Sequence, residues 1–233
     1  MPNQDPSPTL TTDSIAKLID HSLLRPQLDR SELEQGIHDA LKYKMAAASV
    51  KPCDVSIASE ILRSSEVATG TVIGFPHGAN TTVVKVYEAL QAIEDGADEL
   101  DMVMNFGLFV SGDYDAVEAD IRAVVDAAHE HSVSVKVIFE IHYLNADGIV
   151  RACQISENAG ADFVKTSTGY APSGATLEAV RLMRASCGPQ VKIKAAGGIR
   201  TLEDVLAYHT AGADRIATRA SISILEEAIA RGL

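Results

Sequence analysis

A tripeptide, Gly-Ala-Asp, recurs three times in the chain, starting at Gly96, Gly160 and Gly212. Each copy follows a predicted helix and precedes a short apolar run. Glycine is common at this position because it adopts the left-handed backbone conformation that ends a helix at no steric cost. The next strand is expected about two residues later. The tripeptide therefore indicates a strand–helix unit that is repeated along the chain.

About eight such units can be followed, with short connections and strands that are nearly continuous apolar runs. Strands of this kind are typical of a parallel sheet that is covered by helices. The expected strands lie at 46–50, 70–75, 99–105, 134–140, 163–166, 191–195 and 215–217, after a brief apolar segment at 20–26. The expected helices lie at 13–19, 31–43, 55–62, 83–94, 116–131, 147–159, 176–185, 202–210 and 221–230.

The repeated unit predicts a single (β/α)8 TIM barrel over residues 13–233, with a short N-terminal helix capped by Asp13-Ser14. The length of 233 residues is close to the ~250 typical of this fold, and no domain break interrupts it. Residues 1–12 are polar and proline-rich, so we expect a flexible tail there. A doubly wound open sheet is the alternative, but the glycine-rich turn that usually follows its first strand is not found.

Composition narrows the class of partner and the compartment. The formal net charge is −12, which argues against a nucleic acid or an anionic membrane as partner. The sequence has no run of ~18 apolar residues, so no transmembrane helix is predicted, and the first residues do not resemble a signal peptide. The three cysteines, Cys53, Cys153 and Cys187, are widely spaced without a CxxC pair, as expected of reduced thiols. We therefore expect a cytoplasmic location.

Two lysines lie inside apolar runs that are predicted to be buried strands. Lys165 precedes Thr166-Ser167-Thr168-Gly169, and Lys194 precedes Ala195-Ala196-Gly197-Gly198 about thirty residues later. A buried ammonium group loses its hydration, and its pKa falls as a result. In a barrel the active site lies at the carboxyl ends of the strands, and neighbouring strands are about 4.8 Å apart. We therefore predict that the two lysines lie close together at the active-site end.

This arrangement suggests Schiff-base chemistry. A second cation disfavours the charged form of a lysine, and the neutral amine attacks the carbonyl carbon of an aldehyde or ketone. Asp101, at the end of another strand, can then help to move protons. Lys192 is the alternative to Lys194, because both point to the same face of their strand. The non-catalytic alternative is a structural ion pair of the lysines with Asp101 or Glu140.

The segment from Gly197 to Thr201 precedes a predicted helix. Free backbone N–H groups at a helix N-terminus suit a phosphate group, as does the loop after strand 7 of a barrel. The alternative is that Gly197 and Gly198 serve only as turn residues. His21, His77 and His142 can each stand near the barrel mouth, but no HxH or HExxH pattern joins them. We expect no metal and no cofactor.

The chain resembles the deoxyribose-phosphate aldolase family from Leu18 onward. The resemblance rests on five segments, at 18–24, 74–78, 99–105, 161–169 and 194–200. It implies a class I, metal-independent aldolase on a (β/α)8 barrel that reversibly cleaves 2-deoxy-D-ribose 5-phosphate to acetaldehyde and D-glyceraldehyde 3-phosphate. By motif match it also implies the roles of individual residues: Lys165 as the Schiff-base lysine, Lys194 as the lysine that perturbs it, Asp101 in proton transfer, Asp20 and Thr168 near the substrate, and Gly169, Gly197, Gly198 and the Arg200 backbone at the phosphate.

One departure from the family pattern concerns the phosphate end. Ala217-Thr218-Arg219-Ala220-Ser221 stands where many members have Gly-x-Ser-Ser. Arg219 can either replace those hydroxyls with a charged fork or narrow the pocket. Three other functions remain as alternatives: a related class I aldolase for a different deoxy sugar, with or without a phosphate, a non-catalytic phosphosugar-binding barrel, and a metal-dependent barrel enzyme that uses the three histidines. The resemblance also implies a homo-oligomer, with a dimer as the usual form.

Overall fold

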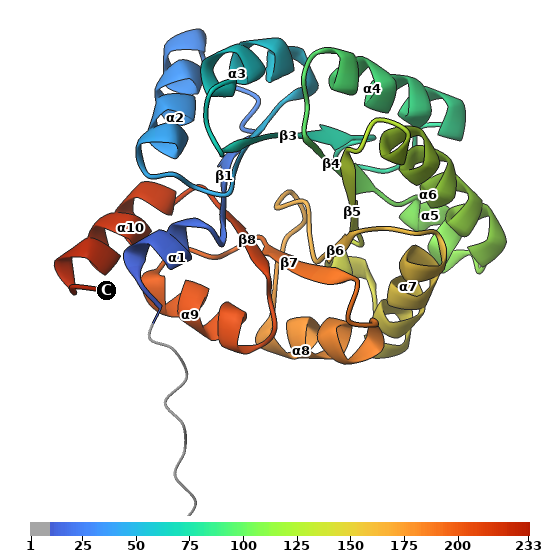
Figure 1. The fold of residues 1–233 in the computed structure, drawn as a ribbon. Coiled ribbons are helices and arrows are strands. Elements are labelled where there is room, and N and C mark those ends of the chain that lie inside the picture. Colours follow the sequence, from blue (N-terminus) through green and yellow to red (C-terminus); the bar gives the residue numbers. More distant parts are fainter. Residues whose placement is uncertain (1–9) are drawn as a thin grey trace, which may run out of the picture.

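The computed structural model describes residues 10–233, in which eight parallel strands form a closed barrel surrounded by helices (Figure 1). Each strand pairs with the next in sequence, and the last pairs with the first, with Asp20 opposite Ala217. The predicted TIM barrel is confirmed, and the open-sheet alternative is wrong. The strands are β1 Ile19–Leu23, β2 Ala47–Val50, β3 Ala68–Ile73, β4 Glu99–Val103, β5 Ser134–Ile138, β6 Phe163–Lys165, β7 Lys192–Ala196 and β8 Arg215–Thr218.

The helices form a ring outside the barrel (Figure 1). Their bounds are α1 Thr12–Ala16, α2 Arg30–Lys42, α3 Val55–Leu62, α4 Thr82–Glu94, α5 Phe106–Val110, α6 Tyr114–His129, α7 Ala146–Asn158, α8 Leu177–Ser186, α9 Leu202–Thr210 and α10 Ser221–Ala230. Short 3-10 turns lie at Pro52–Asp54 and Ile141–Tyr143. No helix within residues 10–233 has the length and apolar character needed to cross a bilayer.

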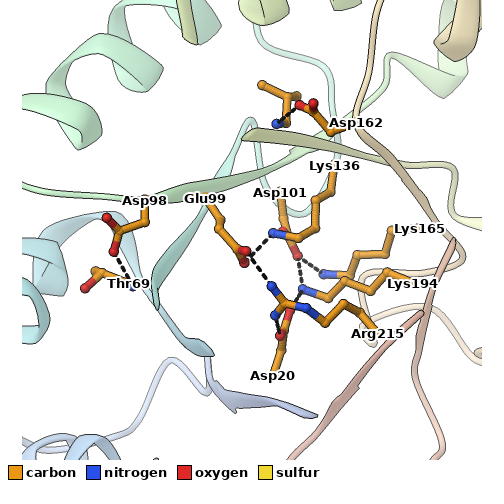
Figure 2. A network of polar contacts seen from close by, with 11 residues as sticks. Asp20, Thr69, Asp98, Glu99, Asp101, Lys136, Asp162, Lys165, Lys194 and Arg215 are labelled. Atoms are coloured by element: carbon orange, nitrogen blue, oxygen red, sulfur yellow. Dashed lines mark hydrogen bonds and ion pairs between the residues drawn. The ribbon is translucent and has the colours of Figure 1, made fainter. Parts of the chain in front are cut away.

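The Gly-Ala-Asp tripeptides lie at the amino-terminal mouth of the barrel, before β4, β6 and β8. Their glycines have the expected positive φ, for example +100° at Gly96. The aspartates add an effect that the repeat alone did not predict. Asp98, Asp162 and Asp214 each accept a backbone N–H from the preceding strand at 2.8 Å (two of these bonds are drawn in Figure 2). Each tripeptide therefore ends a helix and fixes the register of the neighbouring strand.

Two local predictions are corrected by the structure. The first helix is capped by Thr11 rather than Asp13-Ser14, since the Thr11 side chain accepts the Ser14 N–H at 3.2 Å, and it ends at Ala16 because β1 begins at Ile19. The strand expected to reach Asn105 ends at Val103, because Asn105 instead caps α5, a helix that was not predicted. The predicted tail at 1–12 lies largely outside the described residues.

The barrel lumen differs from the shell around it. Side chains such as Leu100, Val137 and Ile193 are fully buried in the apolar core. In most barrels of this fold the lumen, like the shell, is filled by branched apolar residues. In this protein the lumen holds charged side chains from β1, β4, β5, β6, β7 and β8 (Figure 2). This charged interior forms the floor of the candidate site.

Candidate active site

Lys165 lies at the carboxyl end of β6 and is only 2% exposed. It pairs in register with Lys194 on β7, so the two predicted lysines are direct neighbours across the sheet. Lys165 also lines a cavity of about 620 Å³ at the carboxyl ends of the strands. The chain therefore presents one amine from the barrel interior to a space that is large enough for a small phosphorylated sugar.

Asp101, on β4, joins the two lysines. One of its oxygens, Oδ2, accepts hydrogen bonds from Lys165 Nζ at 2.6 Å and from Lys194 Nζ at 2.7 Å (Figure 2). Its other oxygen, Oδ1, lies 3.2 Å from Lys136 Nζ. These lysines hold the pKa of Asp101 well below its usual value, although burial acts in the opposite direction. Asp101 is thus a carboxylate under the conditions of catalysis.

The two lysines differ in protonation. Burial, helped by the positive charge of Lys194 and opposed by Asp101, lowers the pKa of Lys165 to about 8. Burial also disfavours the charge on Lys194, but Asp101 and Asp20 outweigh it and raise the pKa of Lys194. About a tenth of Lys165 is therefore a neutral nucleophile at pH 7, whereas Lys194 remains a cation. Of the two causes that the sequence suggested, burial and a neighbouring cation, burial is the larger.

Replacement of Lys194 by leucine tests this asymmetry. Loss of a fixed positive charge beside Lys165 should raise the pKa of Lys165 by about one unit, which lowers the neutral fraction at pH 7 by about tenfold. We expect the rising limb of kcat/KM against pH to move to higher pH, with partial recovery of activity above pH 9. Lys192→Leu, two residues earlier on the same strand, is the matched control. An unmoved limb in Lys194→Leu would contradict this role.

Lys192 is not the partner of Lys165. Its side chain is exposed at the amino-terminal mouth, where its Nζ lies 5.4 Å from the centre of the Phe163 ring. Lys194 instead reaches both Asp101 and Asp20. The strand is long enough that two lysines on one face lie at opposite ends of the barrel. The Lys192 alternative is therefore wrong. Of the two ion pairs considered for the lysines, the one with Asp101 is present, and none with Glu140 is found within residues 10–233.

The remaining predicted site residues fall into two groups. Thr168, Gly169, Gly197, Gly198, Arg200 and Arg219 all line the cavity, together with Tyr170 and the segment from Leu24 to Gln27. Asp20 does not line it, because its side chain is fully buried in the lumen against Lys194 and Arg215. Asp20 therefore lies inside the lumen, in contact with Lys194, and not at the cavity wall.

Thr168 is held in a fixed orientation at the cavity wall. Its hydroxyl donates to Glu140 Oε2, and the Thr168 Oγ1 atom itself accepts the N–H of Tyr170 at 3.0 Å. Glu140 has a left-handed backbone conformation with φ of 52°, an uncommon conformation for a residue other than glycine. Because the Thr168 proton is already donated, its free lone pair is suited to accept a hydrogen bond from a substrate hydroxyl.

The phosphate end combines open backbone with unpaired arginines. Gly198 has φ of +87° with no heavy atom near its Cα face, and within residues 10–233 no protein acceptor takes its N–H. The Arg200 backbone N–H, expected to meet phosphate, instead donates to Asp204 at 2.9 Å, which corrects that prediction. The side chains of Arg200 and Arg219 are exposed, and among the described residues no carboxylate lies within 4.0 Å of either guanidinium.

The histidines do not converge. His21 is buried against Ser221, with Nδ1 2.9 Å from the hydroxyl oxygen, and burial lowers its pKa to about 4. His142 contacts Ser173 in an exposed loop. Over residues 10–233 no group of three histidine, cysteine, aspartate or glutamate side chains is placed to bind a metal ion. The structure therefore does not assemble His21, His77 and His142 into one ligand set.

Three charged lumen residues were not predicted, namely Glu99, Lys136 and Arg215. Lys136 donates to Glu99 at 2.7 Å, and Arg215 bridges Glu99 and Asp20 (Figure 2). A signal was present for two of them. Lys136 lies between Val135 and Val137, much as Lys165 follows Val164, and Glu99 lies two residues before Asp101 on the same face of its strand. Arg215, at the start of a short strand, carried no such signal.

Comparison with known proteins agrees with the geometry. A profile described as DeoC/LacD family aldolase matches residues 14–221. A curated deoxyribose-phosphate aldolase of Streptococcus equi subsp. zooepidemicus is 49% identical over 219 residues, which cover 94% of this chain and 99% of the relative.

Two solved structures are similar along most of their length. A putative deoxyribose-phosphate aldolase from Coccidioides immitis has a TM-score of 0.91 at 40% identity, with 96% of this chain and 91% of that chain covered. The deoxyribose phosphate aldolase from Aeropyrum pernix, described as having a unique tetrameric structure, has a TM-score of 0.87 at 31% identity, with 93% and 92% covered. With its barrel, its paired lysines and these relatives, the chain belongs to the DeoC/LacD family of aldolases.

Proposed function

We propose that the protein catalyses the reversible aldol cleavage of 2-deoxy-D-ribose 5-phosphate to D-glyceraldehyde 3-phosphate and acetaldehyde, through a Schiff base on Lys165. The observation that carries the proposal is Lys165 itself. It is buried, has a pKa near 8, lines the cavity, and shares one carboxylate oxygen with a permanently charged lysine. The substrate is that of the relatives that are 49% identical along nearly the whole chain.

The mechanism follows from these contacts. The neutral Nζ of Lys165 attacks C1 of the open-chain aldehyde, and loss of water gives an iminium ion. The iminium withdraws electrons, so the C2–C3 bond breaks as the C3 hydroxyl loses its proton, and glyceraldehyde 3-phosphate leaves. Protonation of the remaining enamine at C2 and hydrolysis of the iminium release acetaldehyde. Asp101, 2.6 Å from Nζ, is placed to accept and return protons at the nitrogen.

The phosphate is assigned to the arginine side of the cavity. Arg219 and Arg200 offer two guanidinium groups without a carboxylate partner among residues 10–233, and Gly198 offers a backbone N–H on the same wall. Guanidinium groups bind phosphate through paired, charge-assisted hydrogen bonds. We therefore interpret Arg219 as the replacement for the hydroxyls that many relatives have here, rather than as a residue that narrows the pocket.

Arg219→Ser tests that assignment. We expect KM for deoxyribose 5-phosphate to rise by about tenfold, since one charge-assisted contact at an exposed site is lost. The kcat/KM for unphosphorylated 2-deoxyribose should not change. If Arg219 instead narrows the pocket, the variant will accept the unphosphorylated sugar better than the parent enzyme does. Steady-state kinetics with the two sugars separates these outcomes and also decides whether the preferred substrate carries a phosphate.

A covalent trap tests the function as a whole. The protein is incubated with deoxyribose 5-phosphate or acetaldehyde, reduced with borohydride and digested. The mass of the peptide that spans Phe163 to Tyr170 is then measured by mass spectrometry. We expect the mass of a reduced adduct on Lys165. Binding of the sugar phosphate without an adduct or turnover would favour a non-catalytic phosphosugar-binding barrel. Activity that is lost with a chelator and restored by a divalent ion would favour metal chemistry.

We propose that the protein is a homo-oligomer, because the similar Aeropyrum pernix aldolase is described as tetrameric. A dimer, the usual form that the family resemblance implies, is proposed as the basic unit. Sedimentation velocity of the full chain measures this. A cytoplasmic location is supported by three free cysteines, of which Cys153 is buried without a disulfide. Reduced thiols of this kind are typical of cytoplasmic enzymes.

A further inference from the structure

Six charged side chains of the lumen form a closed ring of ion pairs, which we call the lumen ring (Figure 2). Carboxylates and cations alternate around it, so each member contacts a neighbour of opposite charge on both sides. In order, the contacts are Asp101–Lys194 at 2.7 Å, Lys194–Asp20 at 2.5 Å, Asp20–Arg215, Arg215–Glu99 at 2.5 Å, Glu99–Lys136 at 2.7 Å and Lys136–Asp101 at 3.2 Å.

Lys165 is attached to this ring as an additional cation. The ring holds three carboxylates and three cations, so it is neutral without Lys165. Each ring cation has two carboxylate partners. Lys165 has one, and shares its oxygen, Asp101 Oδ2, with Lys194. A protonated Lys165 would give the buried lumen one uncompensated positive charge, which is costly in a region of low dielectric.

No other ionisable side chain of the barrel changes this count. The segments β2 and β3 contain none. His21 on β1 faces Ser221, and Glu140 after β5 contacts Thr168. Lys51 after β2 pairs with Asp54. Lys17, Asp162, Lys192 and Asp214 line the amino-terminal cavity next to Glu99 and Arg215, but their side chains are accessible to solvent, which screens their charges. The buried balance of three carboxylates against four cations therefore belongs to the ring and Lys165.

We propose that Arg215 is a positioning residue for the aldol reaction. Its guanidinium group pairs with two carboxylates of the lumen ring, Asp20 and Glu99, and so leaves Lys165 as the cation in excess. Arg215 touches neither the cavity nor the reacting atoms. It acts from the amino-terminal side of the barrel, through Asp20 and Lys194 on one path and through Glu99 and Lys136 on the other. This inference rests on the proposed function only in taking Lys165 as the nucleophile.

Substitutions that replace a charged ring residue by neutral glutamine test the proposal, because they should shift the pKa of Lys165 in opposite directions. In Arg215→Gln the three carboxylates match three lysines, so Lys165 should keep its proton and its pKa should rise by about one unit. In Glu99→Gln the excess positive charge grows, so the pKa of Lys165 should fall. The double variant restores a neutral ring without Lys165, and its pKa should return to near the parent value. Lys192→Gln, at the same mouth but outside the ring, should cause no shift.

The pKa of Lys165 can be measured without turnover. The protein is labelled with 13Cε-lysine, the Lys165 resonance is assigned by its absence in Lys165→Met, and its shift is followed against pH. In the active enzyme the rising limb of kcat/KM should move with it, to higher pH in Arg215→Gln and back in the double variant. If Arg215 had only a structural role, Arg215→Gln would lower activity without moving the rising limb of kcat/KM. Addition of Glu99→Gln would then not restore the activity.

The outcomes separate this inference from the proposed function. If both single variants leave the Lys165 pKa unchanged, or shift it in the same direction, the role of the ring is overturned even when the carbonyl adduct forms. If the pKa shifts as expected but no adduct forms, the proposed function alone fails. Should Arg215→Gln not fold, Lys136→Met removes a ring cation at another position and must raise the pKa. A folded Lys136→Met with the parent pKa overturns the proposal equally.

Discussion

Replacement of Lys165 by methionine is expected to abolish the carbonyl adduct and to lower kcat by on the order of 10⁴-fold or more. The cleavage depends on the iminium ion, and the neighbouring amine of Lys194 stays protonated, because Asp101 and Asp20 raise its pKa. Methionine fills a similar volume without an amine. The measurements are steady-state kcat with deoxyribose 5-phosphate and the mass of the borohydride-reduced peptide.

Lys165→Arg is the matched control for charge. It keeps a cation next to Asp101 but has no amine that becomes neutral, so it should also be inactive. Lys165→Met removes the uncompensated charge from the lumen, so its resistance to urea should equal or exceed that of the parent protein. Residual turnover above about a hundredth of the parent rate in Lys165→Met would mean that another residue forms the Schiff base.

Replacement of Asp101 by asparagine is expected to destabilise the protein by about 3 kcal/mol at pH 7. Asp101 is 2% exposed and contacts three lysines, of which Lys165 has no other carboxylate partner among residues 10–233. Removal of one partner from a buried ion-pair network leaves charges that neither water nor protein compensates. Urea unfolding of both proteins measures the difference. Asp126→Asn, an exposed carboxylate on α6, should change stability by less than about 0.5 kcal/mol.

The same comparison has a predicted pH dependence. The folded-state pKa of Asp101 lies well below its usual value of 3.8, so ionisation of this group favours folding. Its contribution is fully present above pH 3.8 and is lost as the pH falls toward the folded-state pKa. The stability difference between parent and Asp101→Asn should therefore narrow below about pH 4. A difference that stayed the same in acid would show that Asp101 acts by packing rather than by charge.

Much of the site could be predicted because barrel geometry converts sequence order into spatial order. Successive strands of a (β/α)8 barrel are neighbours, so lysines at the ends of consecutive strands must lie side by side. Lys165 and Lys194 are paired in register for this reason. The short apolar runs around them were enough to predict burial, and burial is the leading cause of the low pKa of Lys165.

The phosphate end was harder to predict from local sequence. The sequence Thr201-Leu202-Glu203-Asp204 is a capping box, and in the structure Asp204 also takes the Arg200 N–H that was assigned to phosphate. The box could have been recognised from the spacing of Thr201 and Asp204. What could not be recognised was whether the arginine side chains would find carboxylate partners elsewhere, because such partners depend on which loops meet above the barrel.

By itself the sequence determined the repeated strand–helix unit, the closed barrel and the two lysines at the ends of neighbouring strands. These follow from periodicity and from chain order. The structure alone decided that Glu99 and Asp20 meet at Arg215, and that Asp20 also reaches Lys194, because β1, β4 and β8 come together only when the barrel closes and its strands tilt. The charge balance that makes Lys165 the excess cation is a property of that closed lumen, since each ring contact joins side chains from different strands.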